Sequence, residues 1–119
     1  MTKSRKVYIF KVCSSSTMGS GHVYRCLKIA KKLKKSDVFF LSNNFKNNFN
    51  YLFKDFNYKI LNNSENNFSH VRDLEDTISF LKKIKKEKIL IVDNYVNELN
   101  WQKKISKFVK KLVVFNDEI

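Results

Sequence analysis

The 119-residue sequence contains no proline and only two glycines, so residues that break helices and strands are rare. A chain with so few breakers is expected to consist of regular elements joined by short connections. The two glycines, Gly19 and Gly21, stand close together in a polar stretch that ends at His22. Because glycine lets the backbone approach a ligand closely, this stretch is the first candidate for a binding site.

Cysteine and long apolar runs are equally scarce. The spacing of the two cysteines, Cys13 and Cys26, fits no zinc or redox motif, and both stand in apolar surroundings. We therefore expect reduced, buried thiols in a cytoplasmic protein. The amino-terminal apolar run is too short for a signal peptide and is interrupted by Lys11. No stretch is long enough to span a bilayer, so we expect no membrane partner.

Positive charge is abundant, but arginine is rare. The formal net charge is +13, and of 24 basic residues only Arg5, Arg25 and Arg72 are arginine. Proteins that recognise nucleic-acid bases or bind phosphates favour arginine, because its planar guanidinium group can donate two parallel hydrogen bonds. We therefore interpret the lysines as solvated surface and expect no nucleic-acid partner. An acidic partner domain or a phosphate-bearing ligand fits the charge equally well.

Five short apolar segments, rich in β-branched and aromatic residues, predict strands. They are residues 6–12, 37–41, 58–61, 88–92 and 112–115.

Helical spacing of apolar residues predicts four helices between these strands. The first begins at His22, with Arg25 among the basic residues on its solvated side, and the second covers 45–56. We expect Asp73 to be the N-cap of the third helix, with Asp76 at the capping-box position, and Asn97 to cap the fourth.

The alternation of strands and helices predicts a single α/β domain over residues 1–119. Short connections favour a parallel, Rossmann-like sheet of about five strands with helices on both faces. Ligands bind such sheets at the carboxyl ends of the strands. The segments 19–22, 93–95 and 116–118 all follow predicted strands at that edge.

The glycine stretch matches neither common nucleotide-binding fingerprint. Tyr24 occupies the third glycine position of a G-x-G-x-x-G motif, and no acidic residue ends the second strand. No G-K-S/T sequence follows the glycines either. The sequence also has no cluster of metal ligands, so we expect no nicotinamide cofactor and no metal.

His22 combines a titratable ring with a helix N-terminus. Free N–H groups and the helix dipole favour anions there and disfavour a charged imidazolium. One interpretation is a general base beside a bound phosphate or sugar. The other is a structural histidine that only hydrogen-bonds the loop.

Three segments carry a resemblance to a known family. Residues 17–30 (TMGSGHVYRCLKIA) resemble the G-x-G-H-x-x-R-x-L motif of the UDP-sugar hydrolases of pseudaminic acid biosynthesis. Residues 89–95 (ILIVDNY) are similar to the family's L-x-I-V-D-H-Y, and 113–119 (VVFNDEI) to its I-x-D-D stretch. Trp101 stands where the family often has tryptophan. The order and spacing agree along nearly the whole chain.

The resemblance implies a fold, a reaction and a set of residues. The family has a two-domain, glycosyltransferase-B-like fold, of which this chain corresponds to the N-terminal half. Its members hydrolyse UDP-2,4-diacetamido-2,4,6-trideoxy-β-L-altropyranose to UDP and the free sugar without a metal ion. The role of general base, which activates water, carries over to His22. Substrate contacts carry over to Gly19, Ser20, Gly21, Arg25, Asp93, Tyr95 and Asp117.

The sequence also departs from the family at ionisable positions. Lys11 and Cys13 stand where the family usually has arginine and aspartate, and Asn94 and Asn116 replace its histidine and aspartate. In the family the C-terminal half grips the nucleotide, and these 119 residues do not correspond to it, so a separately encoded or fused C-terminal half would have to supply it. Two alternatives therefore remain open: a non-catalytic remnant or binding module of the same fold, and part of a glycosyltransferase.

Overall fold

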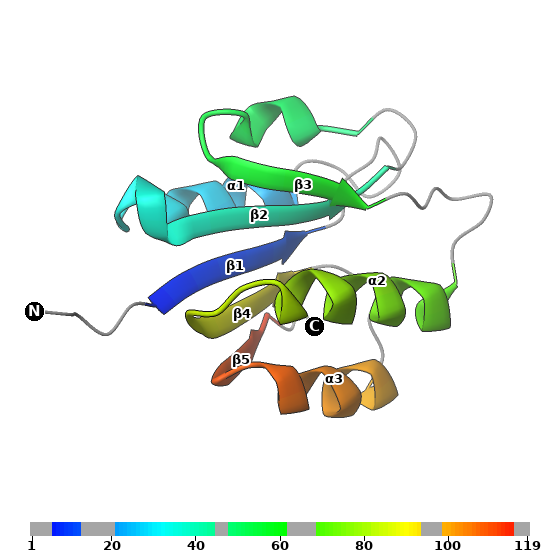
Figure 1. The fold of residues 1–119 in the computed structure, drawn as a ribbon. Helices are drawn as coiled ribbons and strands as arrows, with labels where there is room; N and C mark the ends of the chain where they lie inside the picture. Colours follow the sequence, from blue (N-terminus) through cyan, green and yellow to red (C-terminus); the bar gives the residue numbers. More distant parts are fainter. Residues whose placement is uncertain (1–5, 13–20, 45–47, 62–68, 94–98, 116–119) are drawn as a thin grey trace, which may run out of the picture.

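The computed structural model of the chain describes residues 6–12, 21–44, 48–61, 69–93 and 99–115. Within these ranges five strands form one sheet in the order β3-β2-β1-β4-β5, and every neighbouring pair is parallel (Figure 1). The strands are β1 (Lys6–Val12), β2 (Val38–Asn43), β3 (Asn57–Leu61), β4 (Glu87–Asp93) and β5 (Lys111–Val114). The parallel α/β fold predicted from the sequence is confirmed.

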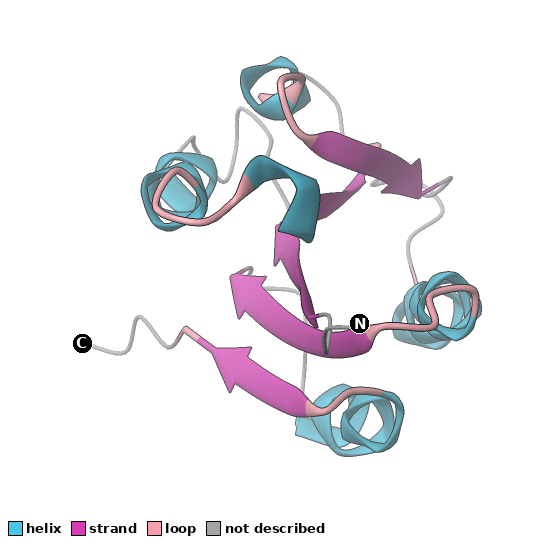
Figure 2. Cartoon of the chain, turned by 60° about the vertical axis from the view of Figure 1, so that its left-hand side comes forward, coloured by secondary structure: helices cyan, strands magenta, loops and turns pink. Residues whose placement is uncertain are grey.

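Helices lie on both faces of this sheet (Figure 2). Helix α1 packs on one face together with a short 3-10 turn, and helices α2 and α3 pack on the other. The α-helices are α1 (Gly21–Ala30), α2 (His70–Lys82) and α3 (Leu99–Ile105), and the 3-10 turns are η1 (Lys35–Asp37), η2 (Asn50–Phe53) and η3 (Ser106–Phe108). No helix in the described part of the chain is long and apolar enough to cross a membrane.

Strand β1 supplies side chains to two separate cores because alternate residues of a strand point to opposite faces. Phe10 and Val12 join the core under α1, whereas Val7 and Ile9 join the core under α2 and α3. This burial on both faces explains the nearly unbroken apolar sequence of the strand.

A stack of aromatic rings fills the core on the α1 face. The ring of Phe40 lies 5.2 Å from that of Phe10 and 4.7 Å from that of Phe53, centroid to centroid. All three side chains are fully buried. Truncation of such a ring to alanine typically costs about 3–5 kcal/mol of stability. The stack therefore anchors η2 and β2 to the central strand.

The strand order reverses direction between β1 and β4. From β1 the chain builds outward through β2 and β3, then returns to place β4 on the other side of β1. Such a switch point opens a crevice at the carboxyl ends of the two central strands, where α/β proteins bind ligands. In this register Val12, the last residue of β1, lies opposite Asp93, the last residue of β4.

The predicted strands agree closely with the observed ones. The strand predicted over 6–12 is confirmed without change, and the others shift by one or two residues at their ends. The predicted cap at Asn97 lies outside the described residues.

The helix predicted over 45–56 is wrong for the part of it that the structure describes. Residues 50–53 form only the 3-10 turn η2. Hydrogen bonds between asparagine side chains and the backbone replace the hydrogen bonds of a helix. Oδ1 of Asn48 accepts a hydrogen bond from the backbone N–H of Asn50 at 3.0 Å, and Nδ2 of Asn50 donates one to the carbonyl of Asn43 at 3.1 Å. Asparagine favours such turns over helix.

The N-cap predicted for the third helix is also wrong. The cap is Ser69, whose hydroxyl oxygen accepts the backbone N–H of Arg72 at 3.0 Å. Asp73 lies inside the first turn of α2, and its carboxylate makes tertiary contacts instead.

Candidate functional site

The candidate site is centred on Asp93, at the end of β4. Because side chains alternate along a strand, Asp93 points to the same face as Ile91, toward α1. Asp93 is buried, with 1% of its surface exposed. A buried carboxylate needs charged or hydrogen-bonding partners, and α1 supplies them.

Three residues of α1 contact this carboxylate. His22, Arg25 and Cys26 stand at helical positions i, i+3 and i+4, which lie on one side of a helix. Nδ1 of His22 lies 2.6 Å from Oδ1 of Asp93. The Sγ of Cys26 lies 3.7 Å from Oδ2 and donates a weak hydrogen bond to it.

Arg25 holds both oxygens of Asp93. Its Nε donates to Oδ2 at 2.8 Å and its Nη2 donates to Oδ1 at 2.7 Å. Such a two-point pair fixes the plane of the carboxylate as well as its charge. The guanidinium carbon also lies 4.9 Å from the ring centre of Phe115, within cation–π range. The prediction that Arg25 lies on the solvated side of the helix is therefore wrong, although its side chain remains 36% exposed.

The environment of Cys26 makes its thiol a poor acid. Burial is the main cause that raises its pKa above the usual range, and the charge of Asp93 and the hydrogen bond to Asp93 raise it further. Arg25 opposes these effects. Cys26 is thus a protonated thiol at neutral pH and is unsuited to be a nucleophile.

The contact between His22 and Asp93 sets the chemistry of the imidazole. When a carboxylate accepts a hydrogen bond from Nδ1–H, the neutral ring carries its basic lone pair on Nε2. The same carboxylate stabilises the imidazolium that forms if Nε2 takes a proton. This arrangement of a base and a carboxylate that orients it is suited to proton abstraction from water or a hydroxyl group.

The structure brings three of the predicted site residues together: His22, Arg25 and Asp93. Gly21 is the first residue of α1, and a Cβ atom built on it meets nothing within 4 Å. Packing against described residues therefore does not require glycine at this position. The remaining predicted site residues, Gly19, Ser20, Tyr95 and Asp117, lie outside the described residues, as do Cys13, Asn94 and Asn116.

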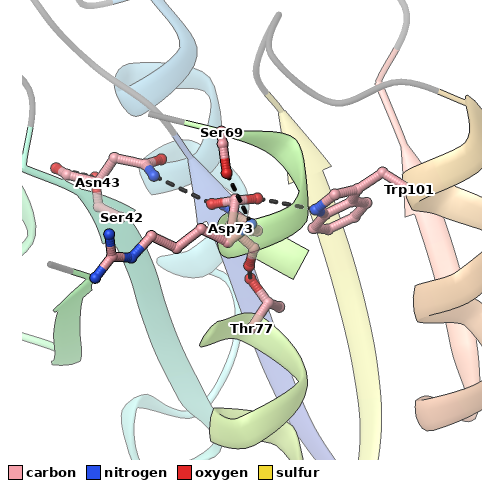
Figure 3. Close-up of polar contacts among 8 residues, drawn as sticks. Ser42, Asn43, Ser69, Asp73, Thr77 and Trp101 are labelled. Carbon is pink, nitrogen blue, oxygen red and sulfur yellow. Dashed lines mark hydrogen bonds and ion pairs between the residues drawn. The ribbon is translucent and has the colours of Figure 1, made fainter. Parts of the chain in front are cut away.

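A second buried carboxylate, Asp73, lies on the face of the sheet that α2 and α3 cover, and Figure 3 shows its contacts. Its Oδ1 accepts hydrogen bonds from Nζ of Lys11 at 3.0 Å and Nδ2 of Asn43 at 3.2 Å, and its Oδ2 accepts from Nε1 of Trp101 at 2.9 Å. Thr77 donates to the carbonyl oxygen of Asp73 at 2.7 Å. The cluster ties α2 to β1, β2 and α3.

Sequence reasoning missed this second cluster. The available signal was Lys11, a charged residue in a predicted strand whose neighbours along the chain are apolar. Such a lysine needs a buried carboxylate as partner. The sequence alone does not show which carboxylate that is.

No group of three or more potential metal ligands occurs among the described residues. No protein-family model matches the sequence, and no curated protein matches it.

Proposed function

We propose that this chain is the N-terminal domain of a nucleotide-sugar hydrolase, which releases UDP from a UDP-linked diacetamido-trideoxy sugar of nonulosonic (pseudaminic) acid biosynthesis. The observation that carries the proposal is the contact between His22 and the Arg25-bound carboxylate of Asp93 at the switch point of the sheet. The G-x-G-H-x-x-R-x-L and I-V-D motifs, on which the family resemblance rests, supply these three residues.

In the proposed reaction His22 is the general base. Nε2 of His22 takes a proton from water, and the water oxygen forms a bond to the anomeric carbon of the sugar. The bond from that carbon to the β-phosphate oxygen breaks, and UDP leaves with the electron pair. Asp93 stabilises the imidazolium that results, and Arg25 holds Asp93 in place.

The start of α1 supports an anionic substrate. The first turn of this ten-residue helix contains no acidic side chain. Its backbone N–H groups and the helix dipole favour the negative charge of a diphosphate. A Cβ atom at Gly21 would meet none of the described residues, and the glycine would let the diphosphate approach the backbone.

One domain supplies one wall of such a site, so the proposed active enzyme needs a C-terminal partner domain that binds the nucleotide. The reaction uses no metal or organic cofactor in this proposal. A cytoplasmic location is part of the proposal, and the buried free thiol of Cys26 is in keeping with a reducing compartment.

The test is UDP release from the diacetamido-altropyranose nucleotide sugar. It compares the purified chain alone with the chain mixed with the C-terminal domain of a family hydrolase. We expect release that requires both parts and falls by about 10²–10⁴-fold in His22→Gln, the usual contribution of a general base. Gly21→Ala should weaken substrate binding without unfolding the chain. Lys28→Gln, at an exposed position of the same helix, should have no effect.

Two outcomes would replace this proposal. Release that depends on an added sugar acceptor would identify part of a glycosyltransferase. No release in any mixture by a correctly folded chain would favour a binding module, in which the buried cluster of His22, Arg25 and Asp93 only stabilises the fold.

A further inference from the structure

The second feature with functional meaning is a hollow on the α1 face of the sheet, which borders the His22 cluster at Phe115. Its volume is about 470 Å³. Side chains of β1, β4 and β5 form its floor, and α1 with the turn after it forms one wall. The apolar residues that line it are Tyr8, Ile29, Leu33, Ile89, Ile91, Val113 and Phe115.

Within the described ranges, this part of the sheet lacks the helical cover that parallel sheets normally have. All-parallel sheets occur with both faces covered by helices. Among the described residues, α2 and α3 cover one face, whereas the other face over β4 and β5 carries no helix (Figure 2). Tyr8, Ile89 and Val113 remain half-buried as a result.

Positive charge stands at one end of this apolar floor. Lys6 and Lys111 line the hollow and are exposed, and they stand at the amino ends of β1 and β5. None of the nine described residues that line it is acidic. The net charge of +13 disfavours a second copy of the same chain as the occupant, because like charges repel.

We propose that this hollow docks an amphipathic helix of a partner protein, with an apolar stripe that faces the sheet and acidic residues along its flanks. The floor strands β1 and β4 have seven residues each and are about 23 Å long, at roughly 3.3 Å per residue. A helix of about 15 residues matches this length.

The positions of the two lysines also define the direction of the docked helix. The C-terminal end of a helix carries partial negative charge and is stabilised by nearby cations. The helix therefore lies antiparallel to the strands, with its C-terminal end beside Lys6 and Lys111. This inference does not depend on the proposed hydrolysis of a nucleotide sugar.

The test uses two fluorescently labelled helical peptides and measures their binding to the full chain by anisotropy. Both carry the same leucine stripe, and one has glutamate and the other lysine on the flanks. We expect the glutamate peptide to bind at least about tenfold more tightly than the lysine peptide, since charge complementarity selects the partner. The preference should shrink at high salt.

Matched variants locate the binding surface. Val113→Asp places a charge on the floor of the hollow and should weaken glutamate-peptide binding about tenfold or more, as loss of a central contact does. Val114→Asp, one residue further along β5 and on the opposite face, should leave binding unchanged. The double variant Lys6→Glu, Lys111→Glu changes two exposed positions. It should weaken binding of the glutamate peptide and strengthen binding of the lysine peptide.

Three results would overturn the inference. The first is that both peptides bind with the same affinity, or that neither peptide binds at concentrations up to about 1 mM. A dissociation constant above that concentration would mean only very weak binding. The second is binding that the double lysine variant does not alter. The third is concentration-dependent dimerisation of the chain alone that Val113→Asp abolishes, which would assign the hollow to a second copy.

Discussion

The ammonium nitrogen of Lys11 lies 3.0 Å from a carboxylate oxygen of Asp73, and the two side chains are 0% and 1% exposed. Burial of two charges is costly unless each is paired and its remaining hydrogen-bonding capacity is used. Here Asn43 and Trp101 also donate to the carboxylate, and the Lys11 nitrogen lies 5.7 Å from the Trp101 ring centre. The pair therefore links four elements through one buried polar cluster.

Removal of one charge from this pair should destabilise the domain strongly. We expect Lys11→Met to lower the free energy of unfolding by about 3–5 kcal/mol, because Asp73 is left as a buried charge without its cation. Urea denaturation measures the change. Lys6→Met, at the exposed start of the same strand, should change stability by less than about 0.5 kcal/mol. Equal effects of the two substitutions would contradict the role assigned to Lys11.

The proton on the His22 ring should reside on Nδ1 when the ring is neutral. Asp93 is a carboxylate 2.6 Å from Nδ1 and accepts a hydrogen bond only from a protonated nitrogen. Nitrogen-15 NMR of the two histidines should show the Nδ1–H form for His22, with His70→Gln used to assign the signals. Asp93→Leu should shift His22 toward the Nε2–H form that predominates in water. A neutral His22 found as Nε2–H in the unmodified chain would refute the geometry.

Cys26 should make the domain less stable at alkaline pH. Its folded-state pKa lies above the unfolded value, so the folded chain keeps the thiol proton at pH values where the unfolded chain has lost it. The stabilisation of the folded chain by the neutral Cys26 thiol is complete below the pKa of this thiol in the unfolded chain. It declines as the pH rises above about 8.5. The free energy of unfolding of the unmodified chain should therefore fall more steeply between pH 8 and pH 10 than that of Cys26→Ala, by up to about 1.4 kcal/mol per pH unit.

Thiol labelling gives a second measurement on the same residue. In a Cys13→Ser background, Cys26 should react with a thiol reagent at pH 8 only at the rate of unfolding, because the buried thiol is neither accessible nor ionised. Labelling as fast as that of a free thiol in solution would disprove the assignment.

The start of α2 depends on Ser69. Ser69→Ala removes the oxygen that accepts the N–H of Arg72 and should cost about 1 kcal/mol of stability. Ser69→Asp should retain the cap. Ser79→Ala, at an exposed position within the same helix, is the matched control and should be neutral, since alanine favours helix interiors. Thermal denaturation of the three variants compares these effects.

The strands could be predicted because their sequences carry the burial pattern directly. The run over Lys6–Val12 is apolar and β-branched because the strand is buried on both faces. The helix over 45–56 could not be judged correctly, since its apolar spacing is helical but the side chains of Asn48 and Asn50 bond the backbone locally. Side-chain competition of this kind is not visible in a hydrophobic pattern.

The residues of the candidate site could be predicted from the sequence, but the contacts between them could not. His22 follows from the glycines and the helix start, and Asp93 from the end of an apolar run. Their contact depends on β4 being the neighbour of β1, which the sequence alone does not specify. The same limit applies to Asp73, which looks like a helix cap in the sequence and proves to be the partner of Lys11.

The central place of β1 also sets the order in which this domain can assemble during synthesis. Strand β1 and helix α1 leave the ribosome early, but the carboxylate that His22 requires follows 71 positions later. Until β4 inserts beside β1, the chain exposes one edge of its central strand and the side chain of Lys11, which is buried in the finished fold. Late, long-range pairing of this kind slows folding and leaves the nascent chain prone to aggregation. The site at the switch point is therefore present only in molecules that have completed the central step of folding.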